Sequence, residues 1–224
     1  MTTEPERSKQ IAIPVVSGML KGNLIAPNDS RGIVFFVHGS GSNRYSPRNQ
    51  YVAGVLENYG LATLLIDLLT TKENEEDARS QRYRFNIDLL AKRIVTITDW
   101  MCENSQARNL AVGYFGASTG AAAAVIAALQ RKDRIKAIVS RGGRLDLAGS
   151  SIMRNVSIPI LLIVGGNDSP AVLHMHQKIL KQLQLVDRDR KGLVIIPGAG
   201  HLFEEPGSLE EVAQHAANWF RKHF

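Results

Sequence analysis

Residues 110–130, LAVGYFGASTGAAAAVIAALQ, contain a predicted strand, a tight turn and a predicted helix in immediate succession. The apolar run at 110–115 predicts a buried strand, and the alanine-rich run at 118–130 predicts a helix. The turn Gly116-Ala117-Ser118-Thr119-Gly120 between them matches G-x-S-x-G. At such a turn the serine hydroxyl projects outward, and the amino terminus of the helix points at it with free N–H groups. Ser118 is therefore a candidate nucleophile, and the alternative is a turn of small residues that packs the helix on a sheet.

Strands and helices alternate on both sides of this unit. Continuous apolar runs predict further strands at residues 33–37, 62–68, 135–139, 158–164 and 193–196, and helical spacing predicts helices at 49–59, 85–102, 171–185 and 208–223. Residues 11–16 and 20–25 predict an edge hairpin, and the charged segment 70–84 is expected to be an exposed loop or the start of a solvated helix. The alternation predicts an α/β fold, a doubly wound, mostly parallel sheet with helices on both faces. We expect a single domain over residues 1–224, with residues 1–10 as a flexible N-terminus.

Two polar residues follow later strands at positions that suit a catalytic triad. Asp168 follows strand 158–164 in Gly-Gly-Asn-Asp, and His201 follows strand 193–196 in Gly-Ala-Gly-His. Carboxyl ends of parallel strands meet at one edge of a sheet, so both residues should lie on the rim that carries Ser118. His201 would then take the serine proton, and Asp168 would orient the imidazole. The alternatives are that Asp168 only caps the next helix and that His201 is an ordinary surface histidine.

An acyl-transfer site also needs hydrogen-bond donors for the oxyanion. We expect one from the backbone N–H of Thr119, directly after the nucleophile, and one from the backbone N–H of Ser40 in the turn His38-Gly39-Ser40-Gly41-Ser42. The alternative for this turn is a plain Gly/Ser loop or a phosphate cradle. The sequence has neither G-x-x-x-x-G-K-[ST] nor G-x-G-x-x-G after a strand, which disfavours a nucleotide site.

The four motifs together resemble those of the α/β-hydrolase superfamily, and from about Gly32 onward the chain is most similar to its dienelactone hydrolase-like group. The motifs are HGSGS at 38–42, GASTG at 116–120, GGND at 165–168 and GAGH at 198–201. The resemblance implies the α/β-hydrolase fold, with Ser118, Asp168 and His201 as a triad in the chain order of that superfamily. Dienelactone hydrolases proper use a cysteine nucleophile, whereas this chain has serine at 118. The resemblance therefore implies a carboxylester hydrolase in general.

The expected substrate is a small carboxylic ester, lactone or thioester. Lid domains in this superfamily usually follow the sixth strand, and residues 141–157 are too few for a large helical lid. Arginine recognises carboxylate and phosphate groups in a bidentate manner, and Arg44 and Arg141 are the candidate substrate contacts at the rim. For the rim arginines as a group, the favoured interpretation is still pairing with nearby acids. The residues concerned are Arg44, Arg48, Arg141 and Arg144, with Asp146, Glu204 and Glu205 as possible partners.

Composition argues against several other classes of protein. The net charge is +6, but acids interrupt the basic runs and no nucleic-acid motif is present, so no nucleic-acid partner is expected. The single cysteine, Cys102, excludes an internal disulfide and fits a cytoplasmic location. The first ten residues lack the apolar core of a signal peptide, and no apolar run approaches the ~20 residues of a membrane span. His174 and His176 point different ways on a predicted helix, so we expect no metal and no cofactor.

Two other functions stay open at this point. An acyltransferase would use the same triad and acyl-enzyme, and a protein of this fold can also serve as a non-catalytic binding protein. The physiological substrate and the oligomeric state do not follow from the sequence.

Overall fold

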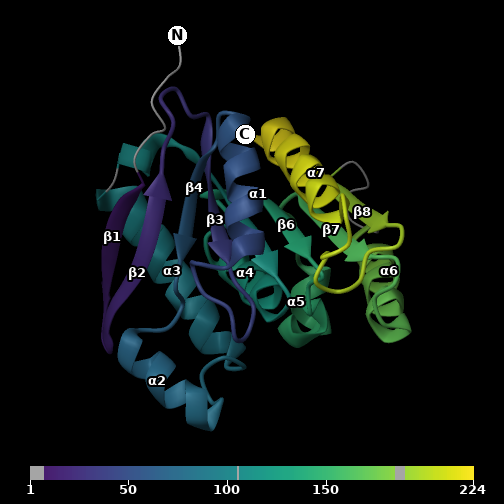
Figure 1. Cartoon of the computed structure of the whole chain (residues 1–224), viewed down its shortest axis with the longest axis horizontal. Coiled ribbons are helices and arrows are strands. Elements are labelled where there is room, and N and C mark those ends of the chain that lie inside the picture. The colour runs from purple at the N-terminus through teal and green to yellow at the C-terminus, as the bar shows by residue number, and fades with distance from the viewer. Residues whose placement is uncertain (1–7, 105, 185–189) are drawn as a thin grey trace.

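The computed structural model of the protein describes residues 8–104, 106–184 and 190–224, and an eight-stranded sheet forms its framework (Figure 1). The strand order is β1-β2-β4-β3-β5-β6-β7-β8. The strands are β1 (Lys9–Val15), β2 (Gly18–Ile25), β3 (Gly32–Val37), β4 (Ala62–Ile66), β5 (Ala111–Ala117), β6 (Ile135–Arg141), β7 (Ile160–Gly165) and β8 (Lys191–Ile196). Only the β1–β2 and β2–β4 pairs are antiparallel in this part of the chain. The expected edge hairpin and the mostly parallel sheet are therefore both present.

Helices cover both faces of the sheet. One face carries α1 (Pro47–Asn58) and α7 (Ser208–His223), which lie in front of the strands in Figure 1. The opposite face carries α3 (Ile87–Asn104), α4 (Thr119–Gln130), α5 (Ser150–Arg154) and α6 (Pro170–Gln184). The short 3-10 helices η1 (Gln106–Asn109) and η2 (Leu145–Ala148) and the helix α2 (Thr71–Ser80) complete the described elements.

The central strands are buried on both faces, which explains why their sequences are continuously apolar. Every residue of β3, β4 and β7 is buried. In β3, Ile33 and Phe35 pack into the core under α3 and α4, while Val34 and Phe36 pack into the core under α1 and α7. Burial of both sets of side chains fixes the register of the strand and thus the position of the loop that follows it.

Two segments differ in detail from the expectation. The charged segment after β4 contains a helix of ten residues, α2, whose first turn is held by a capping box of Thr70 and Glu73. The expected flexible N-terminus is in part a strand, since residues 9 and 10 belong to β1, and residues 1–7 lie outside the described residues. Between β6 and β7 the chain forms only η2 and the five-residue α5, so there is no large lid.

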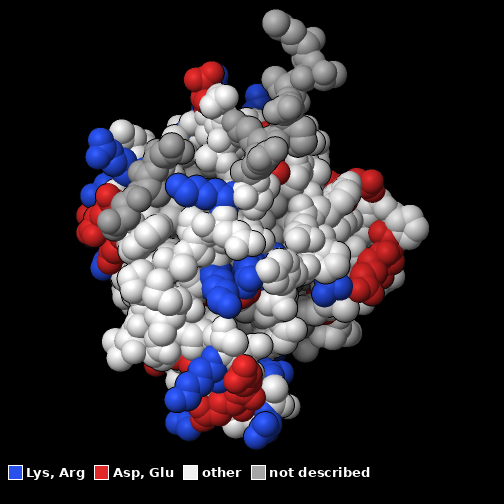
Figure 2. Space-filling model, turned by 60° about the vertical axis from the view of Figure 1, so that its left-hand side comes forward, with Lys and Arg blue, Asp and Glu red and all other residues white. Residues whose placement is uncertain are grey.

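The surface alternates in charge where α2 lies. Figure 2 shows acidic and basic side chains intermixed at the bottom of the view, the part of the molecule that α2 occupies. The helix contributes Lys72, Glu75, Glu76 and Arg79 to this exposed surface. No helix among the described residues has the length and apolar character needed to cross a bilayer.

Candidate active site

Ser118 lies at a strained turn between β5, a central strand, and α4. Its backbone has φ 49° and ψ −123°, a conformation that costs energy for any residue except glycine. The surroundings hold it there. Ser118 N donates to Arg141 O at 3.1 Å, and Ser118 O accepts from Ala121 N at 3.1 Å and Arg144 N at 3.0 Å. A serine in this strained geometry, at the carboxyl end of a parallel strand, is typical of a nucleophile elbow.

The two glycines of the motif make the turn possible. A Cβ on Gly116 would lie 2.6 Å from Ala121 Cα, and a Cβ on Gly120 would lie 2.4 Å from the carbonyl oxygens of Val37 and His38. No real Cβ comes this close to backbone atoms. Glycine at these positions therefore lets α4 start directly against the ends of β3 and β5.

Asp168 and His201 meet through a hydrogen bond between two neighbouring loops. His201 Nδ1 lies 2.8 Å from Asp168 Oδ2, and the carboxylate is buried while the imidazole is half-exposed. The loops after β7 and β8 are also joined through their backbones, because Gly166 N donates to Ile196 O at 2.7 Å and Asn167 N to Ala199 O at 2.8 Å. The pair is thus part of a rigid double loop at the carboxyl edge of the sheet.

The same edge brings His201 beside Ser118. A Cβ on Gly142 would lie 3.3 Å from His201 Cε1, and Gly142 directly follows Arg141, whose carbonyl holds the Ser118 backbone. Both Ser118 and His201 lie in the described part of the chain, and no hydrogen bond joins their side chains in this structure. Such catalytic hydrogen bonds are often long without substrate and shorten only in the Michaelis complex.

The loop after β3 contacts the nucleophile directly. A Cβ on Gly39 would lie 3.0 Å from Ser118 Cβ. The backbone N–H of Ser40 donates to Thr119 Oγ1 at 2.9 Å. This N–H is the expected oxyanion donor, and in the structure it already has a hydrogen-bond partner in Thr119, the residue after Ser118.

His38 holds this loop in place. It accepts a hydrogen bond at Nε2 from Leu68 N, at 3.2 Å, and its Nδ1 lies 3.0 Å from Gly39 O. This pattern requires the neutral tautomer with the proton on Nδ1. Burial lowers the pKa of His38, which agrees with a neutral imidazole. His38 therefore links the loop of residues 38–42, which carries the expected oxyanion donor and is here named the oxyanion loop, to the segment after β4.

Three of the four rim arginines form ion pairs. Arg48 Nη1 lies 2.7 Å from Glu204, and Arg144 Nη2 lies 2.7 Å from Asp146. Both acids are among the expected partners. Arg44 pairs with Asp67 instead, through its side chain and its backbone N–H. A candidate substrate contact, Arg44, thus already has a carboxylate partner inside the protein.

Arg141 is the exception among these four. Its side chain is only 8 % exposed, its guanidinium lies 5.8 Å from the centre of the Phe115 ring, and its Nη1 has no hydrogen-bond partner. Burial and the neighbouring Arg48 lower the pKa of Arg141 to about 10. Arg141 is the last residue of β6, the strand end whose carbonyl accepts from Ser118 N, and no carboxylate among the described residues pairs with its guanidinium.

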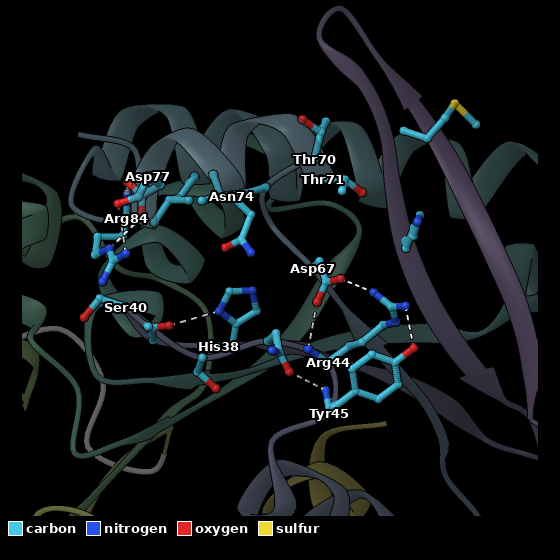
Figure 3. A pocket seen from close by; sticks show the side chains of 18 residues that line it. His38, Ser40, Arg44, Tyr45, Asp67, Thr70, Thr71, Asn74, Asp77 and Arg84 are labelled. Carbon is cyan, nitrogen blue, oxygen red and sulfur yellow. Dashed lines mark hydrogen bonds and ion pairs between the residues drawn. The ribbon is translucent and has the colours of Figure 1, made fainter. Parts of the chain in front are cut away.

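A cavity of about 170 Å³ lies between the oxyanion loop and α2 (Figure 3). Its wall includes Ser40 and Gly41 of the loop, Lys21 of β2, and Asn74 of α2, whose side chain points toward His38 in the figure. Arg84 also lines it and is held by Asp77 at 2.5 Å. The sequence does not predict this wall, because the charged segment 70–84 is expected to be an exposed loop or the start of a solvated helix. The Thr70-x-x-Glu73 spacing is the signal that could reveal it.

Comparisons with known proteins agree with this architecture. The family model described as "Dienelactone hydrolase family" matches residues 20–224. The structure matches that of a dienelactone hydrolase from Anabaena variabilis ATCC 29413 with a TM-score of 0.93 and 53 % sequence identity, covering 99 % of this chain and 100 % of that chain. It also matches Est1E from Butyrivibrio proteoclasticus with a TM-score of 0.77 and 16 % identity, covering 96 % of this chain and 98 % of that one, which bears on the fold alone.

A curated relative is longer than this chain. A Mycobacterium tuberculosis H37Rv protein with the name "Putative phosphoribosyl transferase" is 47 % identical over 219 residues, which are 98 % of this chain and 47 % of that protein. The chain thus spans about half the length of this relative. With its fold, its motifs and a family match over residues 20–224, this chain belongs to the dienelactone hydrolase family and has the α/β-hydrolase fold.

Proposed function

We propose that this chain is a serine hydrolase that cleaves small carboxylic esters, lactones or thioesters through an acyl-enzyme on Ser118. One observation carries the proposal most directly. The His201–Asp168 pair, with 2.8 Å between Nδ1 and Oδ2, lies beside a serine at φ 49° at the carboxyl edge of the sheet. An aspartate that accepts from Nδ1 leaves Nε2 of the neutral imidazole free to take the serine proton.

The reaction follows from this arrangement. Ser118 Oγ attacks the carbonyl carbon as His201 takes its proton, and the carbonyl π electrons move to the oxygen. The backbone N–H groups of Thr119 and Ser40 are the proposed donors to that oxyanion. The carbonyl re-forms as the bond to the alcohol or thiol breaks, and His201 gives its proton to that leaving group, so the acyl group stays on Ser118. His201 then takes a proton from a water molecule that attacks the acyl carbon. The bond from that carbon to Ser118 Oγ breaks, and His201 returns the proton to Ser118 as the acid leaves.

The shape of the site favours small substrates. Only η2 and α5 stand between β6 and β7, so no helical lid encloses a long acyl chain. We therefore propose short esters or lactones ahead of long-chain lipids.

An anionic group on the substrate is a secondary part of this proposal. Arg44 has its own carboxylate in Asp67, so it is the weaker candidate for a substrate contact. Arg141 is buried and has no acid partner among the residues that the structure describes, and a substrate carboxylate near the rim would supply one.

The decisive experiment compares Ser118→Ala with Ser151→Ala on p-nitrophenyl acetate. Ser151 is an exposed serine on α5, so its variant controls for the loss of a hydroxyl elsewhere in the molecule. We expect turnover to disappear in Ser118→Ala and to persist in Ser151→Ala, with unchanged melting temperatures. Full activity in a folded Ser118→Ala protein would reject Ser118 as the nucleophile.

Two alternatives are separated by related measurements. An acyltransferase would transfer the acyl group to added alcohols in preference to water, which product analysis detects. A non-catalytic binding protein would not react with a fluorophosphonate probe at Ser118. The phosphoribosyl transferase name belongs to a protein of which this chain matches under half. We therefore do not extend that activity to this chain.

A further inference from the structure

The hydroxyl of Thr119 occupies a special position in the site. Thr119 is the first residue of α4 and is 4 % exposed, so its side chain is fixed between the helix and the oxyanion loop. Its Oγ1 accepts the hydrogen bond from the Ser40 N–H at 2.9 Å. The Ser40 and Thr119 N–H groups are the proposed oxyanion donors, so this hydroxyl lies next to the position that the oxyanion would occupy.

The hydrogen-bond capacity of the hydroxyl is only partly used. A threonine hydroxyl has one proton to donate and two lone pairs that accept. In the described part of the chain, the hydrogen bonds of Thr119 Oγ1 include the one it accepts from Ser40 and none that it donates. A hydroxyl that accepts from an N–H group becomes a better donor, because neighbouring hydrogen bonds polarise one another. The proton of Thr119 Oγ1 is therefore available to an acceptor beside Ser40 N.

We propose that the Thr119 hydroxyl is a third donor to the oxyanion, a catalytic role in addition to that of its backbone N–H. The inference rests on the proposed function, because it concerns the intermediate formed on Ser118. When the carbonyl oxygen becomes negative, Thr119 Oγ1–H donates to it, and the Ser40 N–H can serve both Oγ1 and the oxyanion. No proton leaves Thr119, so the contribution is a hydrogen bond that is strongest to the charged oxygen.

A competing interpretation makes the opposite prediction. If the hydroxyl only occupies the Ser40 N–H, it would compete with the oxyanion, and its removal would accelerate turnover. If it donates, its removal should slow the chemical step and leave substrate binding nearly unchanged, because the ground-state carbonyl is a weaker acceptor than the oxyanion.

The test uses three variants on p-nitrophenyl acetate. Thr119→Val has nearly the same shape without the hydroxyl, Thr119→Ala removes it with less steric demand, and Thr119→Ser keeps it. We expect kcat of the Val and Ala variants to fall about tenfold to hundredfold with little change in KM, below the ~10²–10³ that loss of a complete oxyanion-hole donor costs. Thr119→Ser should recover most of the rate. Binding of a trifluoromethyl ketone, which forms a tetrahedral adduct, should weaken in parallel with kcat.

The outcomes separate this inference from the proposed function. Equal or faster turnover in Thr119→Val and Thr119→Ala, in protein that melts as the wild type does, would overturn the donor role. Slow turnover in Thr119→Ser as well would also overturn it, because the hydroxyl is still present there. Failure of the proposed function would look different: the wild type would show no turnover, or Ser118→Ala would retain it.

Discussion

Asp168 divides its two carboxylate oxygens between two partners. Oδ2 lies 2.8 Å from His201 Nδ1, and Oδ1 accepts from the backbone N–H of Ser169 at 2.7 Å. The first turn of α6 is capped by another residue, because Val172 N donates to Ser169 Oγ at 3.4 Å. The described hydrogen bonds thus give Asp168 no direct part in the cap of α6.

This division makes Asp168→Asn a sharp test. The amide can keep the contact with Ser169, so stability should change little. The variant would, however, favour the wrong imidazole tautomer, which costs about 10⁴ in rate in a serine protease. We expect a loss of about 10³–10⁴ in kcat/KM. The acids Glu204 and Asp146 are paired with Arg48 and Arg144, so neither is free to replace Asp168.

The measurement is kcat/KM of Asp168→Asn beside its melting temperature. The control is Asp146→Asn, which removes a rim carboxylate that contacts Arg144 and not His201. Near-normal efficiency in a stable Asp168→Asn protein would leave the triad without its acid.

The acid limb of the pH–rate profile should report His201. As a general base His201 must be neutral to take the serine proton, so kcat/KM measured from about pH 5 to 8 should be lowest at the acid end of this range. Two other histidines near the site interfere little. Burial lowers the pKa of His38 and of His176, so both stay neutral at pH values where an ordinary histidine is protonated. A flat profile over this range, in protein shown to be folded by circular dichroism, would count against His201 as the base.

The sequence predicts the central sheet and the three proposed catalytic positions because the signals there are local. Apolar runs in β5, β7 and β8 are followed by Ser118, Asp168 and His201, and parallel topology alone places the ends of these strands on one edge. Gly116 and Gly120 lie in the same five residues as Ser118, so the tight turn can be predicted from this short motif. These predictions do not depend on which distant segments of the chain are in contact.

What the sequence does not predict depends on contacts between distant segments. Helix α2 has few apolar residues, and it is held by a buried ion pair from Glu73 to Arg93 of α3 at 2.6 Å. The spacing of Ser208 and Glu211 predicts a capping box, and this prediction is wrong, because Gly207 is the N-cap of α7 and no side chain caps that end. The Ser40–Thr119 hydrogen bond joins residues that are 79 positions apart in the sequence, and no local sequence pattern predicts it.

Asp77 lines the cavity beside the oxyanion loop, and its carboxylate should contribute less to the free energy of unfolding in acid than at neutral pH. Burial raises the pKa of Asp77, but hydrogen bonds from the Arg84 side chain and from the backbone N–H groups of Tyr83 and Arg84 outweigh it, and the pKa is lowered overall. A carboxylate with a lowered pKa stabilises the fold above the pKa of the unfolded chain. That stabilisation disappears as the pH falls through the folded-state value.

Melting temperatures as a function of pH measure this effect in the wild type and in Asp77→Asn. We expect the wild type to melt higher at neutral pH and the difference to shrink as the solution is acidified. Asp133→Asn, at an exposed position, is the matched control and should follow the wild-type curve. A difference between wild type and Asp77→Asn that stays constant with pH would contradict this assignment.

The last prediction concerns the unpaired guanidinium of Arg141. If it binds an anionic group of the substrate, 4-acetoxybenzoate should be a better substrate than its neutral methyl ester, and Arg141→Met should abolish the preference. A hydrogen bond to a charged group contributes about 1.5–3 kcal/mol, so the ratio of the two kcat/KM values should fall about tenfold to hundredfold. Arg144→Met removes another rim charge, one that already has Asp146 as its partner, and it should leave the ratio unchanged.

Stability gives this prediction an independent check. Burial and Arg48 lower the pKa of Arg141, so the charged form is disfavoured by folding, and this cost diminishes only as the pH rises through about 10. Methionine fills the same space beside Phe115 without a charge, and Arg141→Met should therefore melt at or above the wild-type temperature at neutral pH. An anion that binds Arg141, such as benzoate, should raise the melting temperature of the wild type and not that of Arg141→Met. A variant that melts lower and keeps the full preference for 4-acetoxybenzoate would mean that Arg141 stabilises the fold and does not bind substrate.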